Sequence, residues 1–598
     1  MKNKKIIKLL FAFLGIAGFY ACSKSFLDVT PQGVLDVTTL STEKGVGKIL
    51  LSAYAMLDGE DGGLGIGGQW GSAGSNFCFG SMGGGEANRG SIPTDQYPNM
   101  GTAIIHSNTP QNPALSDSWI WYYEGIKRSN TVLEVLGNVP TISAASKLNI
   151  EGQARFLRAW YHFQARIVFG RVPWIDVAAD SALILHSIVS VANNVEIFPN
   201  ILADAKYAYD NLPATQDSKG RINKWTAGAF YGKVLMFTHD YATAQTVLKD
   251  VFDNGTTPLG TKYALNANYH DNFDVNKENS PETVFDFQSS SQDGAGARNA
   301  NWDDNLNTTA QFGGAGFFDP TYWFTNQFKT DAAGLPLSDA AAQTNDVLDP
   351  NGTSPVSGAS PGYTQYAGNV DTRLDWTVGR NGIPFFDYGN YLTTWQRDRT
   401  AGPYAAKKTM IPQTDIGATH DASIWFAAGG TALNIHLIRF SDVMLMLAEA
   451  DVEQGDLQSA FDLVNAVRTR AKNTPTVKTY IDPTKPSGGS TNVDAANYST
   501  NPYPTVFPSA DVARAAVRKE RTLELGMEGQ RFFDLVRWGT AATDLNAFYQ
   551  YESLIPYQAT SGDLKGTPVY TDDSLHNYYA IPQGQIDLSH GFLTPLKP

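Results

Sequence analysis

The sequence predicts a mainly α-helical protein in which a scaffold of helical pairs carries a large, irregular, loop-rich region with a minor amount of β structure. Three observations predict this class. Apolar residues recur with the helical period in segments such as residues 46–57. Residues 151–169 are apolar almost all round, as expected of a deeply buried helix. Between residues 289 and 436 the helical period fades, and glycine, asparagine, aspartate and aromatic residues dominate.

Two helix–turn–helix segments resemble each other, which indicates stacked helical pairs. They are Thr226–Gly255 and Ser441–Ala471, and their turns align Asp240 with Asp456. An aspartate at this position can cap the second helix of each pair. The arrangement is typical of tetratricopeptide-like repeats, in which each pair packs only on its neighbours. Asp117 is expected to cap another helix of the scaffold in the same way.

The stretch Arg518–Gly539, RKERTLELGMEGQRFFDLVRWG, combines dense charge with aromatic residues that favour burial. We expect a helix with its N-cap at Asp511 and a left-handed C-terminal turn at Gly526. Glu520 and Glu524 are four residues apart and share a face of that helix. Charges of both signs among aromatic residues predict a partly buried ion network, and an alternative reading is a glycosidase-type carboxylate pair. The predicted network comprises Glu520, Arg521, Glu524, Arg531, Asp534 and Arg537.

The N-terminus has the layout of an export signal. Four lysines precede a short apolar run, Leu9–Tyr20, and Cys22 follows directly after Ala21. We therefore predict a signal peptide over residues 1–21 and acylation of Cys22, which would attach the protein to a membrane by lipid. Cys78 is then the single remaining thiol, so no intramolecular disulfide is expected.

Composition and the absence of known motifs exclude several classes of function. A net charge of −14 argues against a nucleic-acid partner, because phosphate binding favours a basic surface. We find no metal-ligand spacing, phosphate loop or nucleophile motif, so the sequence predicts no metal, no cofactor and no enzymatic activity.

The stretch at residues 520–538 resembles the C-terminal signature of the SusD/RagB family, the surface nutrient-uptake lipoproteins of Bacteroidetes. The family pattern runs roughly E-R-x-x-E-L-x-x-E-G-x-R-x-x-D-L-x-R-W, and the chain matches it from Glu520 to Trp538. Two more signatures are similar, one at residues 152–174 and one at Arg439–Ala471, where Glu449 and Arg468 are typical. The mature N-terminus, SKSFLDVTPQG after Cys22, also resembles the family's.

The resemblance implies a single SusD-like domain over residues 22–598. Its helical scaffold would lie mainly at 34–57, 115–255 and 437–550, and its loop-rich binding regions at 59–114 and 289–436. It implies a surface-exposed, lipid-anchored protein of the cell outer membrane. Such a protein binds a glycan and delivers it to a SusC-like TonB-dependent outer-membrane transporter. In the family the C-terminal signature is structural and does not contact the ligand.

Aromatic residues beside amides and carboxylates mark the two loop-rich regions. An indole or phenol ring can cover the apolar face of a sugar while neighbouring polar side chains bond its hydroxyls. By the resemblance, ligand residues come from about these two places. The five phenylalanines at positions 312, 317, 318, 324 and 328 are expected in the core instead. The candidate ligand-binding residues are Trp70, Asn76, Glu86, Asn88, Arg89 and Tyr97 in the first region and Asn301, Trp302, Asp303, Tyr322 and Trp323 in the second.

Three classes of function stay open from the sequence. The first is the glycan-binding uptake lipoprotein that the resemblance implies. The second is a lipoprotein of the same fold that takes up or adheres to peptide or glycoprotein. The third is a glycoside hydrolase, which would need two carboxylates facing one cleft.

Overall fold

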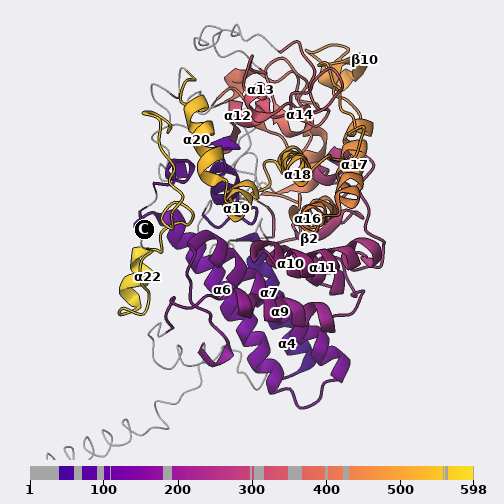
Figure 1. Ribbon diagram of the computed structural model, residues 1–598. Helices are drawn as coiled ribbons and strands as arrows, with labels where there is room; N and C mark the ends of the chain where they lie inside the picture. Colours follow the sequence, from indigo (N-terminus) through magenta and orange to yellow (C-terminus); the bar gives the residue numbers. More distant parts are fainter. Residues whose placement is uncertain are drawn as a thin grey trace, which may run out of the picture.

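The computed structural model describes residues 40–59, 71–90, 100–107, 109–179, 191–295, 299–301, 316–347, 366–396, 402–421, 430–555, 558 and 563–596. Within these ranges the protein is mainly α-helical with short strands, as the sequence predicts (Figure 1). The helices are α4 (Glu43–Ala55), α5 (Gly101–Ile104), α6 (Pro113–Gly137), α7 (Ala144–Phe169), α9 (Phe198–Asn211), α10 (Lys224–Phe237), α11 (Tyr241–Asn254), α12 (Tyr322–Asn326), α13 (Asp339–Ala342), α14 (Leu374–Thr377), α15 (Ile416–Thr419), α16 (Phe440–Gln454), α17 (Leu457–Asn473), α18 (Ala510–Leu525), α19 (Arg531–Arg537), α20 (Ala541–Glu552) and α22 (Gln583–Leu588).

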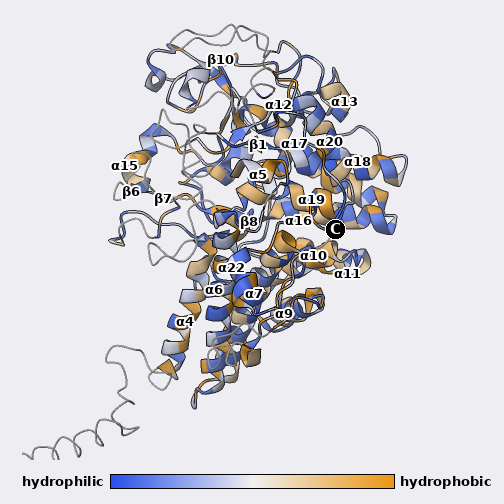
Figure 2. Cartoon of the chain, turned by 90° about the vertical axis from the view of Figure 1, so that its left-hand side faces the viewer, coloured by the Kyte–Doolittle hydropathy of each residue, from blue (hydrophilic) through white to orange (hydrophobic). Residues whose placement is uncertain are grey.

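The long helices form one continuous array. Each packs on the next, in the order α6, α7, α9, α10, α11, α16, α17, and α18 then packs on both α16 and α17. In Figure 1 this array runs from α4, α6, α7 and α9 at the bottom to α16, α17 and α18 above. Helices α10 and α16 are buried on nearly every face, and Figure 2 colours much of both as hydrophobic. Stacking of helical pairs therefore builds the core.

The two predicted turn caps are confirmed. The Asp240 side chain accepts a hydrogen bond from the Thr243 N–H and begins α11, and Asp456 accepts one from the Ser459 N–H and begins α17. Each cap satisfies one N–H that the first turn of a helix leaves free. The resemblance between the two segments thus reflects one shared helix–turn–helix geometry.

Three predicted helix ends are wrong. Asn112 rather than Asp117 caps α6, and Ser509 rather than Asp511 caps α18. In both cases a cap lies earlier in the chain, and Pro113 can occupy the first turn of α6 because it needs no hydrogen-bond donor there. Gly526 is extended, with φ −54° and ψ 140°, and the left-handed residue is Met527, with φ 68°.

The strands are β1 (Ala87–Asn88), β2 (Thr283–Phe287), β3 (Asp319–Pro320), β4 (Val378–Gly379), β5 (Ala405–Ala406), β6 (His420–Asp421), β7 (Gly430–Thr431), β8 (Ile435–Arg439), β9 (Lys478–Tyr480) and β10 (Ser490–Asp494). They pair antiparallel as β1–β3, β2–β8, β4–β5, β6–β7 and β9–β10. The β2–β8 pair holds the two ends of the predicted insert together, with Phe287 opposite Ile435. Inside the insert, Phe385, Tyr391, Ala405 and Met410 form a small second core.

Among the described residues, no helix is both long and apolar enough to span a membrane. Cys22 lies outside the described residues. Cys78 is a free, buried thiol, and burial raises its pKa to about 12. Four of the five phenylalanines expected in the core are buried there, and Phe312 lies outside the described residues.

Candidate functional site

The inner face of α18 carries two fully buried carboxylates that bind arginines from distant parts of the chain. Arg373 Nη1 lies 2.7 Å from Glu520 Oε1 and 3.0 Å from Glu524 Oε2. Arg468 Nη1 lies 2.9 Å from Glu520 Oε2, and Arg439 Nη1 lies 2.8 Å from Glu524 Oε1. Arg470 also pairs with Glu524. We call Glu520, Glu524, Arg373, Arg439, Arg468 and Arg470 the α18 ion cluster.

The α18 ion cluster does not have the form of a catalytic carboxylate pair. Burial alone would raise the pKa of Glu524, but the charges of Arg470, Arg439 and Arg373 hold it well below its usual value. Both glutamates have no exposed surface, and their oxygens are occupied by guanidinium groups. A general acid needs a raised pKa, which Glu524 lacks, and access to substrate, which neither glutamate has.

A second set of ion pairs fixes α19 against α16 and α18. Arg521 lies 2.9 Å from Asp534 and 2.8 Å from Asp442, and Arg537 lies 2.8 Å from Asp534. Arg537 also pairs with Glu449 on α16. Five charged residues of the signature stretch thus belong to two buried ion sets, and most of their partners come from outside the stretch: Glu520, Arg521, Glu524, Asp534 and Arg537.

Arg531 departs from the predicted network. Its guanidinium donates to the Gly84 carbonyl at 3.1 Å and to Thr522 Oγ1 at 2.9 Å, and its nearest carboxylate, Asp544, is 3.8 Å away. Its side chain points along the outer side of α18, away from the inner-face glutamates, so it bonds backbone and hydroxyl oxygens instead. The expectation that Arg531 pairs with Glu520 or Glu524 is wrong.

The two loop-rich regions meet at the pairing of β1 with β3, which we call the β1–β3 junction. Ala87 lies opposite Pro320 and Asn88 opposite Asp319. Gly90 approaches Gly316 so closely that a Cβ at Gly90 would lie 1.6 Å from the Gly316 carbonyl oxygen. Residues 87–90 and 316–320, which are more than two hundred residues apart in sequence, therefore lie side by side.

Glu552 and Glu86 organise the β1–β3 junction from inside. The Tyr322 and Trp323 N–H groups donate to Glu552 at 3.2 and 3.0 Å, so the first turn of α12 is bound to a carboxylate. Asn88 Nδ2 donates to the same carboxylate at 3.4 Å. Glu86 Oε2 accepts from Ser81 Oγ at 2.7 Å and from the Met527 N–H at 3.0 Å. Burial raises the pKa of both carboxyls to about 7.

The described candidate residues of this region are mostly interior. Trp323 is 6% exposed and lies against Tyr551, and the Asn76 amide bonds Gln164 and Tyr122. Arg89 is half-buried beside Asp563, at 3.5 Å. Protein groups bond the Asn76 amide and the Asn301 amide nitrogen, and Tyr551 lies against the Trp323 ring. Ligand contact by these residues stays a prediction. The buried ones are Asn76, Glu86, Asn88, Asn301, Tyr322 and Trp323. Trp70, Tyr97, Trp302 and Asp303 lie outside the described residues.

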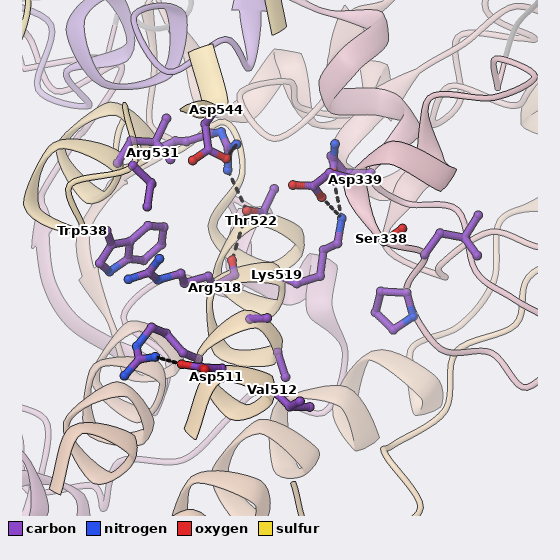
Figure 3. Close-up of a pocket in the computed structure, with 18 of the residues that line it drawn as sticks. Ser338, Asp339, Asp511, Val512, Arg518, Lys519, Thr522, Arg531, Trp538 and Asp544 are labelled. Atoms are coloured by element: carbon purple, nitrogen blue, oxygen red, sulfur yellow. Dashed lines mark hydrogen bonds and ion pairs between the residues drawn. The ribbon is translucent and has the colours of Figure 1, made fainter. Parts of the chain in front are cut away.

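A cavity of about 620 Å³ runs along the outer face of α18; we call it the α18 groove (Figure 3). No sequence feature indicated it, because its walls come from α18, α19, α20 and the segment before α13. Figure 3 shows Trp538 and Arg518 on one side of α18 and Lys519 with Asp339 on the other. Its charged and aromatic lining comprises Asp339, Tyr503, Asp511, Arg514, Arg518, Lys519, Arg531, Trp538 and Asp544.

Arg518 differs from the other cations of the α18 groove. Lys519 Nζ lies 2.6 Å from Asp339, and Arg514 Nε lies 2.7 Å from Glu453. In the part of the chain that the structure describes, Arg518 has no carboxylate at ion-pair distance, and its buried Nε–H has no acceptor. Its guanidinium carbon lies 4.7 Å from the centre of the Trp538 ring, and burial lowers its pKa. The groove therefore offers one unpaired cation over an aromatic face.

Comparison with known proteins gives one consistent result. Residues 281–593 match the family model described as the SusD family, and residues 25–236 match one described as "Starch-binding associating with outer membrane". A SusD-like protein of Bacteroides ovatus is 23% identical over 90% of this chain and 83% of its own length. SusD-like protein P38 of Formosa agariphila is 24% identical over 90% and 93%.

Solved structures agree on the fold. A SusD superfamily protein from Bacteroides vulgatus has a TM-score of 0.64 at 20% identity, covering 92% of this chain and 98% of that one. Surface glycan-binding protein A from Bacteroides thetaiotaomicron, solved with laminarihexaose, has a TM-score of 0.61 at 18% identity, covering 93% and 99%. These likenesses establish that the overall fold is shared.

Proposed function

Because the chain belongs to the SusD family, we propose that it is a lipid-anchored protein of the cell surface that binds an oligosaccharide or polysaccharide. In this proposal Cys22 carries the lipid, and the bound glycan passes to a SusC-like TonB-dependent outer-membrane transporter. The solved relative with laminarihexaose supports a glycan as ligand. The outer-membrane association in the description of the second family model supports the location.

The observation that carries the proposal is the β1–β3 junction. It brings together the ends of two helix-poor segments, and those segments contain Trp302 and Tyr97. Aromatic rings bind the C–H faces of sugars, and amide and carboxylate groups bond their hydroxyls. A binding surface of this kind needs rings from two segments, and the pairing of β1 with β3, which joins the described ends of the two segments, supports this proposal.

Weak binding is the expected outcome of such a surface. Affinities between micromolar and millimolar correspond to about 4–8 kcal/mol. Loss of one stacking ring costs about 1–3 kcal/mol, by analogy with bases stacked on aromatic side chains. A carrier that hands its ligand to a transporter also needs to release it, and weak binding permits this.

Titration calorimetry of the folded protein with its cognate oligosaccharide tests the proposal. Trp302→Ala and Tyr97→Ala should each lower the affinity by about tenfold or more. Trp538→Ala, in the α18 groove, is the matched control and should leave the affinity unchanged. If the Trp538 variant lost binding while the other two retained it, the ligand would lie in the α18 groove and not near the β1–β3 junction.

A second candidate function is peptide binding in the α18 groove. The observation that favours it is Arg518, a cation without a carboxylate partner among the described residues, in a groove that carries charges of both signs. A peptide carboxylate could pair with that guanidinium, whereas a neutral glycan could not. Arg518→Met should then abolish binding of peptides with a free C-terminus and spare oligosaccharide binding. Equal binding of amidated and free peptides would contradict this reading.

A further inference from the structure

A second cavity lies on the helical scaffold, and it shares no lining residue with the α18 groove. Its volume is about 270 Å³. We call it the β2 cavity, because β2 forms its inner wall. The other walls are the connection between α9 and α10, at residues 219–221, and the connection between α11 and β2, at residues 257–261 and 278–279.

Four polar side chains that line the β2 cavity have buried atoms without a hydrogen-bond partner in the described part of the chain. The atoms are Arg221 Nη1, Asn279 Nδ2, Thr283 Oγ1 and Asp286 Oδ2. Thr283 and Asp286 are 8% and 3% exposed, so bulk water does not compensate them. A buried polar group without a partner costs about 1–3 kcal/mol. Four such groups around one cavity indicate a site that a polar ligand completes.

The protonation of the cavity's acidic groups follows from their neighbours. Asp286 Oδ1 lies 2.7 Å from His436 Nδ1, and His436 Nε2 lies 2.6 Å from the Asn272 carbonyl oxygen. Because both ring nitrogens face acceptors, the imidazole is protonated and neutralises Asp286. Burial, and then the charge of Asp286, raise the pKa of Glu278 to about 8, so this carboxyl is mainly protonated at neutral pH. Glu278 accepts the Asn434 N–H at 2.5 Å.

These groups define the chemistry of a suitable ligand. Arg221 and Asn279 offer donors, Asp286 offers an acceptor, and Thr283 can do either. Val284 and Phe285 supply apolar wall, while Leu259 is 61% exposed. A metal ion does not fit, since Arg221 is cationic and the described residues contain no group of three or more metal-ligating side chains. An anion would be repelled by the nearby Asp286 carboxylate. A neutral ring that carries hydroxyl groups could bond the donors and the acceptors of the cavity and pack against its apolar wall.

We propose that the β2 cavity binds one neutral, hydroxyl-rich ring of monosaccharide size, independently of the glycan surface near the β1–β3 junction. In this proposal the helical scaffold, which the sequence predicts to be structural, carries a ligand site separate from the loop-rich regions. It would accept a free monosaccharide or the terminal residue of a longer chain.

Saturation-transfer NMR of the full mature chain tests the proposal, with D-glucose, D-galactose, D-mannose and D-glucuronate as separate probes at millimolar concentration. At least one neutral hexose should bind. Thr283→Val removes a hydroxyl that has no protein partner, so the variant should fold and bind that hexose at least tenfold more weakly. Asn279→Gly should act in the same direction, because glycine tolerates the left-handed backbone of Asn279, φ 55°.

Two control variants separate this site from the proposed glycan surface. Thr131→Val makes the same chemical change on the exposed side of α6 and should leave hexose binding unchanged. Trp302→Ala should also leave it unchanged, even where it removes oligosaccharide binding. The proposal is overturned if no neutral hexose binds, if glucuronate alone binds, or if Thr283→Val and Asn279→Gly both bind as the wild type does.

Discussion

Replacing Arg373 by methionine is expected to destabilise the protein strongly without changing its ligand binding. Arg373 is fully buried and holds three carboxylates at once. Its Nε and Nη2 bond Asp371 at 2.9 and 3.0 Å, and its Nη1 bonds Glu520 and Glu524. Methionine restores the volume of the side chain but not its charge. Glu520 and Glu524 keep other arginines, whereas Asp371 loses its ion-pair partner among the described residues.

The magnitude follows from the uncompensated carboxylate. Removing one partner of a buried ion pair costs about 3–5 kcal/mol. An unfolding entropy of about 2.1 cal/mol/K per residue gives roughly 1.3 kcal/mol/K for a chain of 598 residues. We therefore expect Arg373→Met to lower Tm by about 2–4 °C. In urea, the same loss lowers the unfolding midpoint at an unchanged slope.

The matched control is an ion pair on the surface. Lys206 and Asp210 lie 2.6 Å apart on α9, with 56% and 46% of their side chains exposed. Lys206→Met should cost less than about 1 kcal/mol. Differential scanning calorimetry of both variants decides the matter. If Arg373→Met melted like Lys206→Met, the α18 ion cluster would contribute no more than a surface pair, and the structural reading would fail.

Three further predictions test other parts of the structure. Burial raises the pKa of Glu86 to about 7 in the folded protein, so the free energy of unfolding declines as pH rises from about 4.5 through about 7 and the carboxyl ionises. Glu86→Gln should remove about 3 kcal/mol of this decline, measured by denaturation at several pH values from about 5 to about 8.5. Gly529→Ala should cost more than about 3 kcal/mol, because its φ is 72° and a Cβ would lie 1.8 Å from the Ser75 carbonyl oxygen. Cys22→Ala should release the protein from washed membranes in a fractionation assay.

Each of these predictions has a control and a contradicting result. A Glu86→Gln protein with the wild-type pH profile would mean that Glu86 is ionised in the fold throughout. Gly539 has a φ of 66° and open space around it, so Gly539→Ala isolates backbone strain of about 1 kcal/mol; equal losses at Gly529 and Gly539 would remove the steric argument. Retention of Cys22→Ala in membranes after a high-salt wash would contradict the lipid anchor.

The sequence predicted the scaffold because the information for it is local. Helical periodicity and the turn residues Asp240 and Asp456 act within a few residues, and the structure contains both caps. Local reasoning failed where two nearby residues compete for one role. Ser509 is positioned to bond the Val512 N–H, so it begins α18 in place of Asp511.

The arrangement of the site could not be predicted in the same way. Arg373 lies about 150 residues before the glutamates that it binds, and no spacing indicates such a partner. The sequence places Tyr322 and Trp323 in a loop-rich region because helical periodicity fades over residues 289–436. They are buried because the first turn of α12 docks on Glu552, far along the chain. The β2 cavity combines residues of strand β2 with residues of two connections, and no sequence motif links them.

Whether this member of the SusD family binds glycans can be measured directly on an array of possible ligands. Labelled mature protein is applied to an array that carries both oligosaccharides and peptides, beside the Trp302→Ala variant. We expect the wild-type protein to bind a defined group of oligosaccharides and the Trp302→Ala variant to lose that binding. Binding confined to peptides, or oligosaccharide binding that the variant fully retains, would contradict it.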